Sequence, residues 1–296
     1  DLHVHLRDLE QADKETIQSG TRAAVAGGVT TLLAMPNTMP RLDRAKTIKR
    51  YQTLIDRDAH CHVHIAGAIS KNCEGRKLAE IDDYKKLGIR VITDDGFDVD
   101  DLGVLEAAFK KASELDLIVM VHPEVMSMSG VINEGAVSKK LDVPGQPNEK
   151  EWKAVERALK LAESTGARTY LTHLTTKESV DLVRRAKQKS DRITCDVTPH
   201  HLMLTEDLVL KLGSLAKVNP PLRTEADRQA LIEGIRDGTV DCIVTDHAPH
   251  EESVKGGPAS GGNLIKAAFG FSGLETLVPA VLTELYHKEH LPLMRV

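Results

Sequence analysis

Two histidines stand two residues apart near the start of the chain, in the alternating segment Asp1-Leu-His3-Val-His5-Leu-Arg7. In a β-strand, residues i and i+2 project from the same face, so His3 and His5 can aim both imidazoles at one point. Neutral imidazole is the commonest metal ligand among side chains, and it suits zinc, iron and nickel. The segment therefore predicts part of a metal site.

Further candidate ligands stand at the ends of later apolar, strand-like runs: Asp94, Asp95, His122, His173 and Asp246. One such residue alone could be a hydrogen-bonded core residue, but a metal site assembled from several strand ends is the simplest reason for the pattern. The set exceeds what one four-coordinate metal requires, so a two-metal site with a bridging carboxylate fits. We expect Asp95 to bridge, with Asp94 as the alternative, because sequence alone does not fix the register at a strand end.

Eight strand-like runs alternate with amphipathic stretches along the chain. The expected strands are Leu2–Leu6, Val29–Met35, His62–Ile69, Ile89–Thr93, Leu117–His122, Thr169–Leu174, Ile193–Thr198 and Asp241–Thr245. The expected helices are Lys14–Ala26, Lys46–Asp56, Leu102–Glu114, Lys150–Ser164, Lys177–Lys189 and Glu225–Asp237.

This alternation indicates a parallel α/β architecture. An open doubly wound sheet is the alternative, but no Gly-x-Gly-x-x-Gly follows the first run. Eight units in about 250 residues match a closed (β/α)8 TIM barrel, which we expect to form one catalytic domain over residues 1–296. In such barrels the active site lies at the C-terminal ends of the strands, which is where the histidines and aspartates fall.

The composition narrows the class of partner. The chain has 296 residues, 41% of them apolar, and a net charge of −5 without a basic stripe, which argues against nucleic acid or an anionic membrane as partner. No run approaches the ~18 to 20 apolar residues of a membrane helix. The four cysteines lack CxxC spacing, so we expect buried reduced thiols and a cytoplasmic location. The Gly- and Ser-rich stretch Glu251–Asn263 is a candidate lid or a plain surface loop.

Longer motifs resemble the dihydroorotases of the amidohydrolase superfamily over nearly the whole chain. The motifs are Asp1-Leu-His-Val-His-Leu-Arg7, Lys14-Glu15-x-x-x-Ser19-Gly20, Ala24-x-x-Gly27-Gly28, Met35-Pro36-Asn37-Thr38, Thr198-Pro-His-His-Leu202, Lys217-Val-Asn-Pro-Pro-Leu-Arg223, Thr245-Asp-His-Ala-Pro-His250 and Gly270-x-x-Gly273-Leu-Glu275-Thr276. Hydantoinases, dihydropyrimidinases and allantoinases of the superfamily usually bridge their metals with a carboxylated lysine on strand four. Here that strand holds no lysine, and its Asp94-Asp95-Gly96 ending resembles the bacterial-type, class I dihydroorotases.

The resemblance implies a site of one or two Zn²⁺ ions and a reaction. One zinc would be held by His3, His5, Asp95 and Asp246, and the second by Asp95, His122 and His173. The implied reaction interconverts dihydroorotate and N-carbamoyl-L-aspartate in pyrimidine biosynthesis. Asp246 would act first as general base and then as general acid toward the ring nitrogen.

A substrate with a carboxylate needs matching donors. Arg7 follows the two histidines on the same expected strand face, and its guanidinium can bind a carboxylate with two parallel hydrogen bonds. The resemblance adds Asn37 and His250 as carboxylate contacts and Asn219 as a contact of the substrate ring. The chain departs from the family pattern at Leu9-Glu10, at Pro123 and at Ala268, where proline is usual.

Two alternatives stay open: a hydantoinase-, dihydropyrimidinase- or allantoinase-like ring hydrolase, and a catalytically silent scaffold homologue. Arg7 with Asn37 argues against the first, and the filled ligand positions argue against the second. The resemblance also implies a homo-oligomer or an association with aspartate carbamoyltransferase. The family's small β-sandwich, built from segments before and after the barrel, is absent from the sequence, so we expect a trimmed chain.

Overall fold

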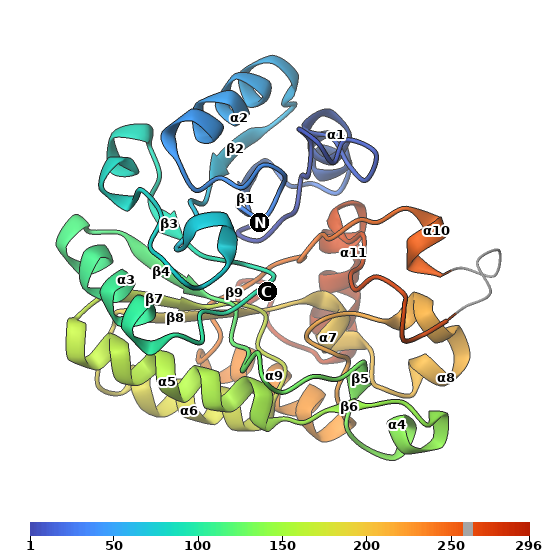
Figure 1. The fold of residues 1–296 in the computed structure, drawn as a ribbon. Helices are drawn as coiled ribbons and strands as arrows, with labels where there is room; N and C mark the ends of the chain where they lie inside the picture. The colour runs from blue at the N-terminus through green and yellow to red at the C-terminus, as the bar shows by residue number, and fades with distance from the viewer. Residues whose placement is uncertain (257–262) are drawn as a thin grey trace.

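The parallel strands close into a ring. In the computed structural model, which describes residues 1–256 and 263–296, β1 (Thr31–Ala34) pairs with β2 (His62–Ile65). A second parallel group runs in the order β3 (Val91–Ile92), β4 (Ile118–Val121), β7 (Arg168–Leu171), β8 (Ile193–Val197) and β9 (Cys242–Ile243). Isolated parallel bridges close the gaps: Gly67 pairs with Ile92, and Val4 pairs with both Ala34 and His247. With the segment around Val4, these strands fill the eight positions of a (β/α)8 barrel, which confirms the predicted fold (Figure 1).

The first predicted strand is wrong in its extent. Leu2–Leu6 contributes only the bridge at Val4, where the carbonyl accepts from the Met35 N–H at 2.9 Å. Beyond Leu6 the backbone leaves the extended region, because Arg7, Asp8 and Leu9 have φ of 53°, 58° and 54°. Arg7 therefore does not continue the strand face of the two histidines as expected.

All six predicted helices are present, with ends that differ by at most three residues. They are α1 (Ile17–Ala26), α2 (Ala45–Asp58), α3 (Leu102–Leu115), α5 (Glu149–Thr165), α6 (Lys177–Lys187) and α9 (Glu225–Asp237). The sequence reading missed the short elements β5 (Ile132–Asn133), α4 (Ala136–Leu141), β6 (Gly145–Gln146), α7 (Pro199–Met203), α8 (Leu208–Leu212) and α11 (Leu277–Val281). Segments this short carry too few residues to show a hydrophobic period.

The candidate lid differs from the loop expected over Glu251–Asn263. Its first part forms the helix α10 (Glu252–Lys255), and residues 257–262 lie outside the described residues. Together α4, α8 and α10 gather on the right in Figure 1, away from α3, α5 and α6.

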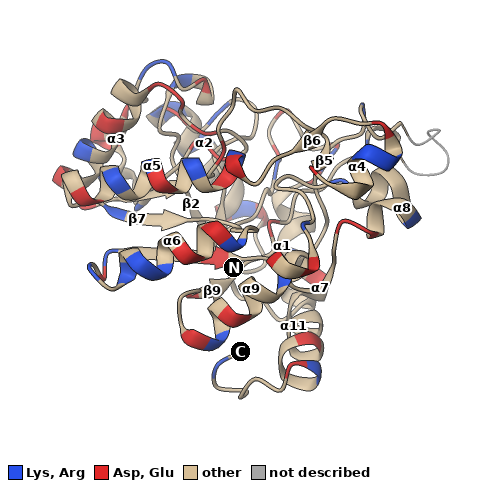
Figure 2. Ribbon diagram, turned by 90° about the horizontal axis from the view of Figure 1, so that it is seen from below, with Lys and Arg blue, Asp and Glu red and all other residues tan. Residues whose placement is uncertain are grey.

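The outer helices turn one apolar face to the barrel. In α3 the residues Leu105, Ala108, Phe109 and Ala112 follow helical spacing, and each is at most 1% exposed. The outward faces carry mixed charge, with basic and acidic residues interspersed along α3, α5 and α6 (Figure 2). Asp101 caps α3 by accepting from the Val104 N–H at 3.0 Å. These helices hold the strands in place, so the strand ends have fixed positions around the barrel mouth.

The four cysteines are free thiols: Cys73 and Cys195 are buried, and Cys61 and Cys242 are half-buried. Within the described ranges, no helix is both long enough and apolar enough to cross a bilayer.

Candidate functional site

Two histidines and two carboxylates converge at the mouth of the barrel. Nε2 of His3 lies 3.1 Å from Oδ1 of Asp95 and 3.4 Å from Oδ1 of Asp246. Nε2 of His5 lies 3.3 Å from Oδ2 of Asp95 and 3.1 Å from Oδ1 of Asp246. Residues from opposite ends of the chain therefore meet because the barrel closes through Val4, between Ala34 and His247.

The other two predicted ligands adjoin this cluster at different distances. Nε2 of His173 lies 3.9 Å from Oδ1 of Asp95, and the ring centres of His173 and His122 are 4.5 Å apart. Two groups of ligand atoms lie within 4.8 Å of one another, namely His3 with Asp95 and His173, and His3 with His5 and Asp246. His122 belongs to neither group among the described residues, so the second predicted metal has a looser set of donors.

The structure places Asp95, and not Asp94, at the cluster. Asp94 turns away and accepts hydrogen bonds from the N–H of Ser70, at 2.9 Å, and from its hydroxyl. Burial raises the pKa of the Asp94 carboxyl to about 6. The bridging role stays a prediction, but only Asp95 has the position for it.

The charges of the cluster are those of a cation site. Burial alone would raise the pKa of Asp95, yet the neighbouring imidazoles of His3 and His5 hold it well below its usual range. Burial would likewise lower the pKa of His3, but the carboxylates of Asp95 and Asp246 outweigh it and raise the value to about 9. The buried carboxylates thus attract positive charge to the point that the imidazoles surround.

Unpaired polar atoms give the test of whether a metal fits. Four buried atoms of the cluster have no hydrogen-bond partner in the described chain: His3 Nε2, Asp95 Oδ1, His122 Nδ1 and His173 Nδ1. Buried polar atoms without a partner are rare in native proteins. Imidazole nitrogens and carboxylate oxygens are also the ligands that zinc accepts. The residues present therefore fit a divalent metal.

Two polar partners fix which nitrogen of each histidine faces the cluster. The Thr172 hydroxyl donates to Oδ2 of Asp196 at 3.0 Å, so its oxygen accepts from Nδ1 of His3 at 2.7 Å. Oδ1 of Asn37 lies 2.9 Å from Nδ1 of His5. In the neutral form that binds a metal, both histidines then carry their proton on Nδ1, which leaves the lone pair of Nε2 free for the metal.

Asp196 and Thr172, which lie behind His3, are residues of the candidate site that the sequence did not predict. Asp196 is fully buried inside β8, and a charged residue in the middle of the apolar run Ile193–Thr198 is the signal that could have found it. Thr172 gives no comparable signal, because threonine is common in strands.

Three candidate site residues adopt left-handed backbone conformations. The φ angles are 53° at Arg7, 38° at His173 and 45° at Asp246. Such conformations are unfavourable for residues other than glycine, and they cluster at functional sites. At these positions the chain turns sharply after a strand position and aims the side chain into the barrel mouth.

A cavity of about 440 Å³ opens above the cluster. Nine of the predicted site residues line it, and His3 lies fully buried beneath: the lining residues are His5, Arg7, Asn37, Asp95, His122, His173, Asn219, Asp246 and His250. Arg7 is 8% exposed, and its Nε has no hydrogen-bond partner in the described structure. Burial lowers the pKa of Arg7, although the carboxylates of Asp246 and Asp95 act in the opposite direction.

One wall of this cavity contains a polar network around Asn219. Its amide donates to Oε2 of Glu124 at 3.3 Å and accepts from Nε2 of Gln146 at 3.1 Å. Glu124 also pairs with Lys150, and Oε2 lies 3.4 Å from Nδ1 of His122. Glu124 is a further residue that the sequence reading missed. It follows Pro123, one of the departures from the family pattern.

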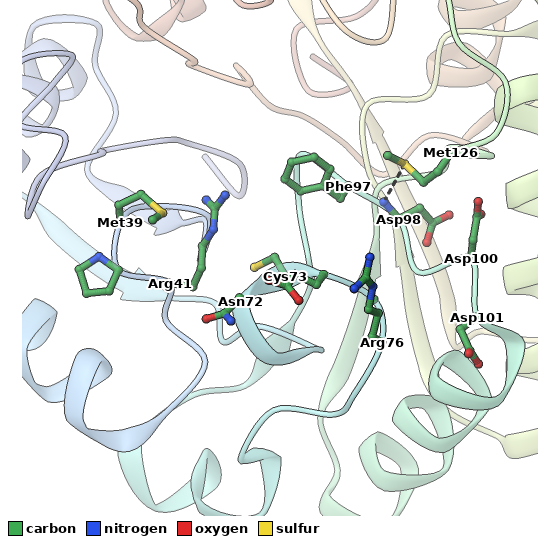
Figure 3. Close-up of a pocket in the computed structure, with 13 residues that line it drawn as sticks. Met39, Arg41, Asn72, Cys73, Arg76, Phe97, Asp98, Asp100, Asp101 and Met126 are labelled. Atoms are coloured by element: carbon green, nitrogen blue, oxygen red, sulfur yellow. Dashed lines mark hydrogen bonds between the residues drawn. The ribbon is translucent and has the colours of Figure 1, made fainter.

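A second cavity of about 760 Å³ lies beside the first and shares Phe97 and Met126 with it. Figure 3 shows Arg41, Cys73 and Arg76 on one side of it, with Phe97 and Met126 across. Of the candidate site residues, none lines this larger cavity.

Comparison with known proteins decides the family. The model of the dihydro-orotase-like family matches residues 1–179. The chain belongs to the dihydroorotase-like family. It is 44% identical to the dihydroorotase of Anaplasma phagocytophilum and 40% identical to that of Thermoanaerobacter sp., over 100% and 96% of this chain. The chain spans 65% of the length of each of these two relatives.

Solved structures share the fold of this dihydroorotase-like chain. The L-hydantoinase (dihydropyrimidinase) from Arthrobacter aurescens superposes with a TM-score of 0.87 at 24% identity, covering 100% of this chain and 67% of that one. The dihydroorotase from Saccharomyces cerevisiae, in complex with 5-fluoroorotic acid, gives a TM-score of 0.75 at 18% identity, covering 98% and 78%. At these identities the likeness concerns the fold alone.

Proposed function

We propose that this protein is a zinc-dependent dihydroorotase, which interconverts dihydroorotate and N-carbamoyl-L-aspartate. The observation that carries the proposal is the convergence of the predicted ligands, with unpaired Arg7, on one cavity of about 440 Å³. Five of the six ligands, His3, His5, Asp95, His173 and Asp246, make up the two donor groups, and His122 beside His173 completes the set. Zinc bound there would supply Lewis acidity, which makes water acidic enough to act as a nucleophile near pH 7.

The chain's own residues supply binding and proton transfer. Arg7 binds the substrate carboxylate, with Asn37 and His250 beside it in the same cavity, and Asn219 contacts the ring. Burial alone would raise the pKa of Asp246, but His3 and His5 hold it well below its usual range, so the carboxylate is ionised at neutral pH. It accepts the proton of the attacking water and returns it to the ring nitrogen as the C–N bond breaks.

Asn37 has a second task in this proposal. Because its Oδ1 contacts Nδ1 of His5, it orients a metal ligand as well as facing the substrate. His250 contacts the substrate as a neutral imidazole, since burial and the charge of Arg7 lower its pKa to about 4.

A hydantoinase-like activity is the alternative, and Arg7 is the residue that argues against it. A neutral ring has no carboxylate to satisfy a buried guanidinium, so this cavity would bind dihydrouracil or a hydantoin poorly.

The test compares substrates on the purified, zinc-loaded protein. We expect one to two zinc equivalents, ring opening of dihydroorotate and ring closure of carbamoyl-aspartate, with activity lost on exhaustive chelation and restored by zinc. Faster turnover of dihydrouracil or a hydantoin would replace the proposal with the alternative. Full activity after chelation would show that the reaction does not depend on a metal.

The cellular location and the protein partners are proposed from fewer observations. Free thiols fit the reducing cytoplasm, where we place the enzyme. Self-association and binding to aspartate carbamoyltransferase stay predictions, which gel filtration with and without that enzyme would check.

A further inference from the structure

Two lysines behind one wall of the 440 Å³ cavity turn their ammonium groups into the protein. Lys217 is 2% exposed, and its Nζ donates to the carbonyls of Ile265 at 2.9 Å and Ala267 at 2.7 Å. Nζ of half-buried Lys255 donates to the carbonyl of Ala268 at 3.3 Å and to that of Lys217. Within the described part of the chain, neither ammonium forms an ion pair with a carboxylate. Buried lysines are normally paired, so this arrangement requires a reason.

Two of these carbonyls, those of Ala267 and Ala268, adjoin or belong to the wall strip, Ala268–Gly270. All three strip residues line the cavity. The Ala268 N–H donates to the carbonyl of Val254 in α10 at 2.8 Å, and the Gly270 N–H donates to the carbonyl of Lys217 at 3.2 Å. The strip is thus attached to α10 on one side and to the Lys217 segment on the other.

Close packing leaves the strip little freedom to move inward. Gly270 has φ of 136°, and a Cβ placed there would lie 2.4 Å from the carbonyl oxygen of Ala248. Ala248 also lines the cavity. Only glycine allows this approach, so the strip lies directly on the segment that carries Asp246.

The lysines also contact the aromatic rings of this region. Nζ of Lys217 lies 4.1 Å from the ring centre of Phe269, and Nζ of Lys255 lies 5.1 Å from that of Phe271. A cation over the face of an aromatic ring attracts the ring, so each ammonium restrains a phenylalanine side chain as well as a backbone carbonyl. Phe269 is itself part of the cavity wall.

The ammonium of Lys255 lies directly behind the cavity wall, because it donates to the carbonyl of Ala268, which lines the cavity. The pKa of His250 is lowered to about 4, first by burial and then by Arg7, Lys14 and Lys255. A substrate with a carboxylate is favoured by such an environment, whereas a neutral ring gains nothing from it.

We propose that Lys217 and Lys255 determine substrate specificity by positioning the wall strip and by placing uncompensated positive charge behind it. They do not contact the reacting atoms. They hold Ala268–Gly270 at the cavity and favour an anionic ring over a neutral one. The preference for dihydroorotate as the anion rests on the proposed function, whereas the attachment of the strip does not.

The first test is kinetic and uses Lys255→Met in the zinc-loaded protein, because half-buried Lys255 can be replaced without opening the core. We expect KM for dihydroorotate to rise about tenfold with kcat changed less than about twofold, since ground-state and transition-state binding are lost equally. Dihydrouracil, which would contact the same wall but carries no carboxylate, should lose clearly less, and Lys255→Arg should restore most of the loss. Lys211→Met, an exposed lysine on α8, is the matched control. Equal losses for both substrates, or none, would overturn the specificity role.

The second test needs no substrate, so it separates this inference from the proposed function. Hydrogen exchange of the peptide that contains Ala268 and Gly270 should accelerate about tenfold in Lys255→Met, because the strip opens more often. Exchange in the barrel strands should stay the same. Unchanged exchange of the strip would overturn the positioning role even if dihydroorotate proves to be the substrate. If exchange of the strip is faster but the protein is inactive on dihydroorotate, the attachment of the strip by Lys255 is supported and the proposed substrate is rejected.

Discussion

The two neighbouring cavities differ in how their charged groups are satisfied. In the larger one, Asp98 and Asp100 pair with Arg157 at 2.7 Å and 3.1 Å, and Arg76 is exposed to water. In the smaller one, Arg7 and Asp95 are buried, and each has a polar atom without a hydrogen-bond partner in the described structure. The larger cavity has a volume of about 760 Å³ and the smaller about 440 Å³. The buried charged groups without hydrogen-bond partners therefore lie in the smaller cavity, not in the larger one.

The contrast indicates that unsatisfied polar groups in the lining of a cavity identify the candidate site better than the volume of the cavity does. Leaving such groups unpaired costs free energy, of the order of 1–3 kcal/mol per group and more for charges. A protein retains them where a ligand satisfies them. Matched substitutions in the two cavities test this difference directly.

The largest effect is expected for Asp246→Asn in the smaller cavity. Asparagine keeps the size but cannot carry a proton at neutral pH, so kcat should fall about 10² to 10⁴-fold in both directions. Zinc content should fall much less, because the other ligands remain. Asp101→Asn is the control in the larger cavity, since asparagine also caps a helix well. Steady-state rates at matched metal content decide the point, and near-parent activity of Asp246→Asn would assign proton transfer to another group.

The next effect is expected for Arg7→Lys. Lysine keeps the charge but loses the pair of parallel donors, and charge-assisted hydrogen bonds contribute about 1.5–3 kcal/mol, so kcat/KM for dihydroorotate should fall about ten- to hundredfold. The measurement is the ratio of kcat/KM for dihydroorotate to that for dihydrouracil. An unchanged ratio would show that Arg7 does not bind the carboxylate.

The sequence predicted the parts of this site that depend on residue type and strand ends. His3, His5, His122, His173 and Asp246 each follow or end an apolar run, and closure of the barrel brings them together. The choice between Asp94 and Asp95 needed the structure, because neighbouring residues at a strand end face opposite ways. The position of Arg7 was predicted for the wrong reason, since it reaches the cavity through a left-handed turn.

The residues around the ligands were harder to predict. Asp196, Glu124 and Lys217 act through contacts with segments far away in the sequence, such as Glu124 with Asn219. No local period or spacing reports such contacts. Likewise, β5 and β6 have two residues each and exist only because each pairs with the other.

Removing the hydroxyl behind His3 should have a moderate effect. Thr172→Val keeps the shape but leaves Nδ1 of His3 without its acceptor, so zinc affinity should fall about tenfold, near the lower end for residues that orient metal ligands. Competition with a chromophoric chelator measures this without an activity assay. Thr172→Ser should restore the affinity, and a valine variant that binds zinc as tightly as the parent would contradict the orienting role.

The smallest effect is expected for Arg76→Lys, which repeats the Arg7→Lys change in the larger cavity. Arg76 is exposed, whereas Arg7 is buried. The donors that are lost at Arg76 therefore bind water and not a ligand, so their loss should matter little. We expect kcat/KM for dihydroorotate to change less than about twofold, and the free energy of unfolding to stay within about 0.5 kcal/mol, as for most surface substitutions. Kinetics and denaturant unfolding of the two arginine variants, measured side by side, give the comparison. A tenfold loss at Arg76 would mean that the larger cavity takes part in binding, and that buried unpaired groups alone do not mark the extent of the site.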